Sequence, residues 1–108
     1  MTPAENRSAV FHVLDAMDHP HGGRILRLRL DRGDAPSLRE LREATLVAVS
    51  GEGERRELEV GGFADLGGKA SDERLARTGR VDVHALDSDG KDGPPVDLKW
   101  EVRLRYDG

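Results

Sequence analysis

The most regular hydrophobic pattern of the chain lies near its C-terminus, in residues 96–106. Apolar and charged residues alternate throughout this segment. A period of two indicates a strand, because successive side chains of a strand point to opposite faces. Residues 26–30 and 81–85 alternate between apolar and polar side chains in the same way. These three segments are predicted to be strands with one apolar and one polar face.

A hairpin is predicted where residues 45–49, which are rich in β-branched side chains, are followed by the alternating residues 57–60. Gly51 and Gly53 lie between the two segments and suit a tight connection. This region contributes two more strands.

The segment 9–17 is ambiguous between strand and helix, because its apolar residues also fit helical spacing. We favour a strand, since Gly22 and Gly23 then close a long hairpin with residues 26–30. Two short helical turns are expected at residues 37–40, where Ser37 and Glu40 have capping-box spacing, and at residues 71–75.

Six alternating strands in 108 residues predict a single all-β domain over residues 1–108. A small closed antiparallel six-stranded barrel with one or two short helical turns is favoured over a two-sheet sandwich, because closure removes exposed strand edges. Residues 1–8 allow a flexible N-terminus. Residues 87–95, which are rich in Asp, Gly and Pro, are expected to form an exposed loop.

Charge and composition narrow the function classes. The 17 basic and 21 acidic residues give a net charge of -4, so any basic surface has to be local. The absence of cysteine excludes thiolate chemistry and fits a reducing interior. No apolar run approaches the length of about 20 residues that crosses a bilayer. We therefore expect a cytoplasmic protein without a membrane partner.

No catalytic motif is recognised, and the chain is predicted not to be an enzyme and to need no cofactor. The glycine-rich residues 61–71 differ from a phosphate-binding loop, because five residues separate Gly62 from Gly68 and Ala70 replaces the magnesium-binding hydroxyl. No nucleotide is therefore expected. The acidic loop lacks the spacing of a calcium-binding loop.

A metal site is the alternative hypothesis. His12, His19 and His21 are close in sequence and Asp15 and Asp18 lie among them, which is a ligand set for zinc, nickel or iron. Their position beside a hairpin end equally fits exposed polar residues. His84 is expected to be a solvated residue on the polar face of its strand.

An arginine pattern supplies the main candidate site. If the strand at residues 26–30 and the C-terminal strand lie side by side, their outward arginines make one basic patch that suits a phosphate backbone. The alternative is that these arginines pair with neighbouring carboxylates such as Asp31, Asp97 and Glu101. The predicted patch consists of Arg24, Arg27, Arg29, Arg103 and Arg105.

The order of motifs over roughly the first 65 residues resembles the β-barrel of translation proteins, found as domain II of translational GTPases and as the N-terminal barrel of ribosome-maturation factors. The resemblance includes residues 11–15, 23–30, 32–33, 38–46 and 56–63, whereas residues 69–80 have no counterpart. It implies a binding module that docks on RNA or on another protein.

The sequence thus predicts a non-enzymatic binding module that docks on a protein or ribonucleoprotein partner. Metal binding through the three histidines is the alternative. Self-association through an open strand edge is a third possibility.

Overall fold

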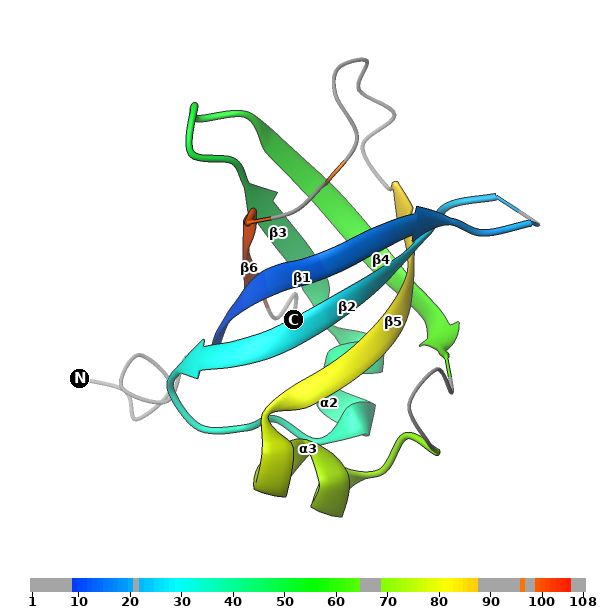
Figure 1. The fold of residues 1–108 in the computed structure, drawn as a ribbon, viewed down its shortest axis with the longest axis vertical. Helices are drawn as coiled ribbons and strands as arrows, with labels where there is room; N and C mark the ends of the chain where they lie inside the picture. The colour runs from blue at the N-terminus through cyan, green and yellow to red at the C-terminus, as the bar shows by residue number, and fades with distance from the viewer. Residues whose placement is uncertain (1–8, 21, 65–68, 88–95, 97–98, 106–108) are drawn as a thin grey trace.

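Six strands form one hydrogen-bonded sheet that closes on itself (Figure 1). The computed structural model describes residues 9–20, 22–64, 69–87, 96 and 99–105. Neighbouring strands are antiparallel throughout, and the order around the ring is β1-β2-β5-β4-β3-β6, with β6 returning to β1. The strands are β1 (Val10–Asp18), β2 (Arg24–Arg32), β3 (Thr45–Val49), β4 (Arg55–Phe63), β5 (Arg80–Asp87) and β6 (Glu101–Arg105).

The apolar faces of all six strands point into the ring and make one hydrophobic core. Burial of this apolar surface is the main favourable term in folding, at about 25 cal/mol per Å². From β4, Leu58 and Val60 belong to this core. The largest side chains with almost no exposure are Phe11, Leu26, Leu28, Leu41, Leu46, Leu75, Val83 and Val102.

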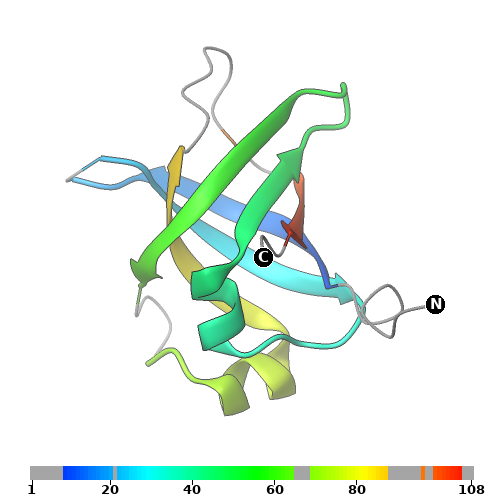
Figure 2. The ribbon, with the colours of Figure 1, turned by 180° about the vertical axis from the view of Figure 1, so that it is seen from behind.

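Two short helices, α2 (Leu38–Glu43) and α3 (Asp72–Thr78), lie next to each other at one end of the ring (Figures 1 and 2). Each helix buries one leucine, Leu41 or Leu75, in the core. A hydrogen bond connects the helices, because the backbone N–H of Leu38 donates to the Asp72 carboxylate at 2.7 Å. The helices therefore cover this end of the apolar core.

The structure confirms several sequence predictions. Residues 10–18 form a strand rather than a helix, and the hairpin of β3 and β4 has its turn at Gly51 and Gly53. The capping box of α2 is present, since Ser37 Oγ accepts from the Glu40 N–H and Glu40 Oε1 accepts from the Ser37 N–H. Both helices are longer than the single turns expected.

The C-terminal strand is shorter than predicted, because β6 begins at Glu101 rather than near residue 96. Lys99 has a φ of 68°, a left-handed conformation that a regular strand does not contain. The Lys99 N–H still donates to the Val13 carbonyl at 2.9 Å, and the Val13 N–H donates to the Trp100 carbonyl at 3.0 Å. Trp100 is buried as the alternation requires.

Several predicted features lie outside the described residues, among them the N-terminus at 1–8, residues 88–95 of the loop predicted at 87–95, and Tyr106. Asp87, predicted as the first residue of that loop, is instead the last residue of β5. One feature of β4 was not predicted: Arg56 points inward with Leu58 and Val60 and is only 6% exposed.

In the part of the chain that the structure describes, no helix has both the length and the apolar character needed to cross a membrane.

The five-residue strand β6 closes the ring, so its inward side chain Val102 is a sensitive position. We expect Val102→Ala to lower the free energy of unfolding by about 2 kcal/mol, because it removes buried methyl groups and leaves a cavity. The adjacent outward substitution Arg103→Ala serves as control and should change stability by less than about 1 kcal/mol. Urea unfolding measures both, and equal effects would contradict an inward-facing Val102.

Candidate functional site

The five arginines predicted to form one patch lie on two separate strands. Arg24, Arg27 and Arg29 are on β2, and Arg103 and Arg105 are on β6. The condition for a single patch, that these two strands are neighbours, is not met, because β1 pairs with both of them and lies between them. Strand order depends on contacts between distant parts of the chain. Alternation within a strand indicates only which side chains share a face, so it does not predict those contacts.

Four of these arginines have carboxylate partners. Arg24 contacts Asp18 at 2.8 Å, and the Arg27 Nε donates to Asp82 at 3.2 Å. On the other strand, the distances are 3.5 Å from Arg103 to Glu101 and 2.7 Å from Arg105 to Glu57. Pairing with neighbouring carboxylates therefore describes these four arginines, across strands for Arg24, Arg27 and Arg105 and within β6 for Arg103. Asp97, another predicted partner, lies outside the described residues.

Arg29 differs from the other four, because its side chain has no carboxylate partner among the residues that the structure describes. It faces Arg80 of β5 directly across the strand pair, and both side chains are exposed. On its other side it faces His12 of β1. Like charges directly opposite each other destabilise a strand pair. We call His12, Arg29 and Arg80 the basic row.

The carboxylates that contact or face the basic row do so at His12, its β1 end. Asp31 is 3.6 Å from the Nδ1 of His12, and Glu101 faces His12 from β6. Glu101 itself is held by Arg32 at 3.1 Å. The positive charge of Arg29 and Arg80 is therefore not neutralised by an ion pair in the described part of the protein.

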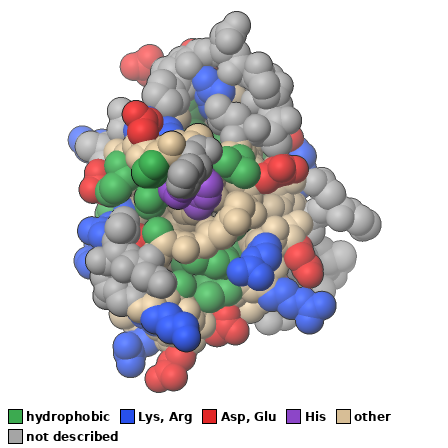
Figure 3. Space-filling model, turned by 90° about the vertical axis from the view of Figure 1, so that its right-hand side faces the viewer, with side chains coloured by type: hydrophobic (Ala, Val, Ile, Leu, Met, Phe, Trp, Pro, Cys, Tyr) green, Lys and Arg blue, Asp and Glu red, His purple; other side chains and the backbone are tan. Residues whose placement is uncertain are grey.

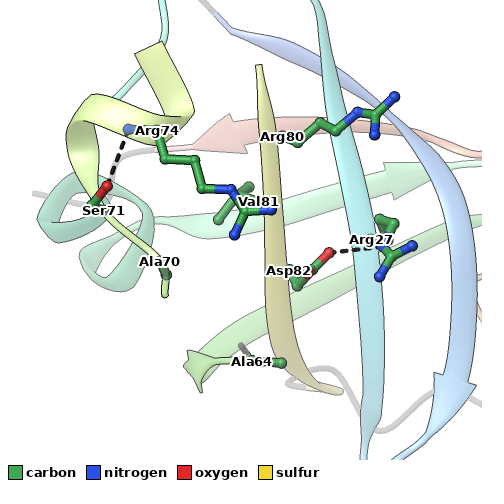
Figure 4. A pocket seen from close by; sticks show the side chains of 8 residues that line it. All are labelled: Arg27, Ala64, Ala70, Ser71, Arg74, Arg80, Val81 and Asp82. Atoms are coloured by element: carbon green, nitrogen blue, oxygen red, sulfur yellow. Dashed lines mark hydrogen bonds and ion pairs between the residues drawn. The ribbon is translucent and has the colours of Figure 1, made fainter. Parts of the chain in front are cut away.

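A pocket of about 220 Å³ adjoins the row, between α3 and the outer faces of β2 and β5 (Figure 4). The polar and charged residues that line it are Arg27, Ser71, Arg74, Arg80 and Asp82, and the remaining lining residues have small apolar side chains. We call this the α3 pocket. Sequence reasoning missed Arg74 and Arg80, because they join Arg27 only when β5 pairs with β2 and α3 folds over it.

Two of the three histidines proposed as metal ligands, His12 and His19, are not brought together. His12 and His19 are seven residues apart on or beside one extended strand, which corresponds to roughly 23 Å. His21 lies outside the described residues. Within the described ranges, no group of three or more His, Cys, Asp or Glu side chains is positioned to hold a metal ion.

His19 instead stacks on His84, with ring centroids 3.8 Å apart and an interplanar angle of 17°. The Nε2 of His84 is 2.8 Å from the Gly22 carbonyl oxygen. His84 is therefore not the solvated residue expected. Gly23 allows this close approach, since a Cβ there would lie 2.5 Å from the Ala85 carbonyl.

Hydrophobic side chains surround the histidines on this face (Figure 3). The strand register places Met17, Ile25 and His84 in one row across β1, β2 and β5. Leu14 and Leu86 are the large hydrophobic residues most exposed in the described part of the chain. Isolated exposed leucines are common on soluble proteins and do not by themselves mark an interface.

Comparisons of the chain with protein-family models, with curated proteins and with solved structures find no match. The function therefore has to be argued from the surface chemistry of this chain.

The histidine stack holds the β1–β2 hairpin tip against β5. We expect His84→Phe, which keeps a ring for stacking but removes the bond to the Gly22 carbonyl, to cost about 1 kcal/mol. Amide hydrogen exchange at Gly22 should become faster, because that amide donates within the tip to the His19 carbonyl. His12→Phe, at the distant end of β1, serves as control. Unchanged exchange in the His84 variant would show that this contact does not hold the tip.

Proposed function

We propose that this chain is a non-enzymatic binding module, a small β-barrel that docks on a ribonucleoprotein by contacting the RNA phosphate backbone. The contact is made by the basic row of His12, Arg29 and Arg80. The observation that supports it is the direct opposition of Arg29 and Arg80 without a carboxylate between them. A phosphate placed between two guanidinium groups replaces their repulsion by two charge-assisted hydrogen bonds.

The arrangement favours contact with the backbone over reading of bases. Proteins that bind single strands stack bases on exposed aromatic rings. Phe11 and Trp100 are buried in the core, and Arg42 lies over the ring of Phe63 at 5.5 Å. Among the described residues the outer surface therefore offers charge rather than stacking platforms. We propose a paired RNA segment, recognised through its backbone, as the target.

The resemblance to translation-protein barrels supports the same proposal, since such barrels dock on RNA or on other proteins. A cytoplasmic location is part of the proposal and is compatible with a chain that has no cysteine. A protein partner is the second candidate. The hydrophobic surroundings of His19 and His84, with Leu86 exposed, are the observation that favours it.

The proposal predicts a specific salt dependence of RNA binding. Replacing both arginines of the row, Arg29→Gln with Arg80→Gln, should reduce the slope of log affinity against log salt by about two, or one for each lost phosphate contact. Stability should not fall, because the substitutions remove a repulsion. Binding of a short RNA duplex is measured at several salt concentrations.

The matched control is Arg55→Gln with Arg105→Gln. These two arginines flank Glu57, at 4.0 and 2.7 Å, on β4 and β6. The control changes the net charge of the chain by the same amount but leaves the basic row intact. An equal loss of affinity in both double variants would refute the row as the contact. No RNA binding by the unaltered protein would instead favour a protein partner.

A further inference from the structure

We propose that His12 makes oxyanion binding at the basic row dependent on pH, so that a phosphate is held more tightly when this imidazole is protonated. The inference rests on the proposed function, because it concerns the regulation of the same row. Histidine is the side chain that ordinarily changes its charge between about pH 5 and pH 8. The row thus combines the two permanent charges of Arg29 and Arg80 with one charge that depends on pH.

His12 occupies the β1 end of the row. The register pairs His12 directly with Arg29 of β2, and Arg29 directly with Arg80 of β5, on three adjacent strands (Figure 1). Neighbouring strands lie about 5 Å apart, so His12 is one strand spacing from Arg29. A phosphate held at Arg29 is therefore within the Debye length of about 8 Å from a charge on His12.

The His12 side chain is accessible to protons and to a ligand. It is 42% exposed, whereas Phe11 and Val13, its neighbours in the chain, are buried. Because side chains of a strand alternate between two faces, the burial of these two neighbours directs the imidazole to the outside of the ring. His12 thus lies on the same outer face as the arginines of the row.

Charged side chains of the described residues face His12 from both neighbouring strands. On β2 these are Arg29, directly opposite, and Asp31, whose carboxylate is 3.6 Å from the His12 Nδ1. On β6 it is Glu101, which the register places opposite His12. Glu101 also pairs with Arg32, at 3.1 Å. Asp31 is therefore the carboxylate that a protonated His12 engages.

Protonation of His12 strengthens the row in two ways. The proton adds one positive charge beside Arg29, which attracts a phosphate held there. It also turns the contact with Asp31 into an ion pair, so the repulsion between Asp31 and a bound anion is reduced. Both effects act in the same direction and increase the affinity for an oxyanion.

Linkage fixes the direction of the pH dependence. An anion beside an imidazole stabilises the charged form of the imidazole. Phosphate binding therefore promotes proton uptake at His12, and protonation of His12 promotes phosphate binding by the same factor. Other charges around the row alter the pH at which the proton is taken up, but they do not reverse this coupling. The affinity must rise as the pH falls.

The test measures the affinity of the full chain for a short RNA duplex at about pH 8 and about pH 5.5, within the range of histidine, at constant ionic strength. We expect an affinity about fivefold higher at the lower pH, from one added charge close to the phosphate. Asp and Glu side chains stay largely ionised there, because their ordinary pKa values are about 4. The phosphodiester does not titrate in this range.

His12→Gln should abolish the gain in affinity at low pH, because glutamine does not titrate. His12→Lys should bind at the higher pH as tightly as the unaltered protein does at the lower pH, since it carries a permanent charge. The matched control is His84→Gln, which removes a histidine of β5 outside the row and should retain the gain. An equal pH dependence in the unaltered protein and in His12→Gln would refute the inference.

A second titration separates this inference from the proposed function. The imidazole proton resonances of His12 are followed by NMR between about pH 5.5 and pH 8, the range in which histidine titrates, in sulfate and in chloride at equal ionic strength. Sulfate, an oxyanion of constant charge in this range, should move the midpoint of the His12 titration to higher pH and leave that of His84 unchanged.

The two measurements together assign each failure. A shift of the His12 midpoint by sulfate, without RNA binding, would support this inference and refute the proposed function alone. RNA binding with a pH dependence that persists in His12→Gln would refute this inference alone. The absence of both RNA binding and a sulfate effect on His12 would refute both.

Discussion

Closure of the ring by β6 is the constraint on which the remaining structure depends. This strand has five residues, and it is hydrogen-bonded to β1 on one side and to β3 on the other. Side chains of a strand alternate between the two faces, so a shift of one residue in either pairing would move Val102 to the surface and an arginine into the core. The closed ring permits no such shift without a large cost. It therefore determines which charged residues face each other on the outside.

The sequence predicts the strands well because their signal is local. The alternation within each segment indicates which side chains are buried. The short connection at Gly51 and Gly53 predicts that β3 pairs with β4, as it does. It does not predict the partners of β5, which inserts between β2 and β4 from a distant part of the chain. Nor does alternation reveal the left-handed Lys99, which interrupts an otherwise uniform pattern. The left-handed backbone conformation of Lys99 cannot be deduced from the polarity of the side chains around it.

The candidate site shows the same limit. Arg29 is evident from the sequence as one of several outward arginines, but only the register with β5 places Arg80 opposite it and leaves it without a carboxylate. Asp82 also belongs to the polar face of its strand, yet it is buried because α3 and the end of β4 cover that part of the sheet. His12 and His19 are close in sequence but far apart in space, because an extended strand separates residues by more per position than any other conformation.

The two sides of the ring differ in how their arginines are compensated. On β4 and β6, Arg55 and Arg105 share Glu57, so one carboxylate offsets part of their positive charge. On β2 and β5, Arg29 and Arg80 sit on adjacent strands about 5 Å apart, well within the Debye length of about 8 Å at physiological salt. They therefore act together as a double positive charge. Acidic groups farther away than this length are largely screened, so a chain with a net charge of -4 still presents a local cationic surface to a polyanion.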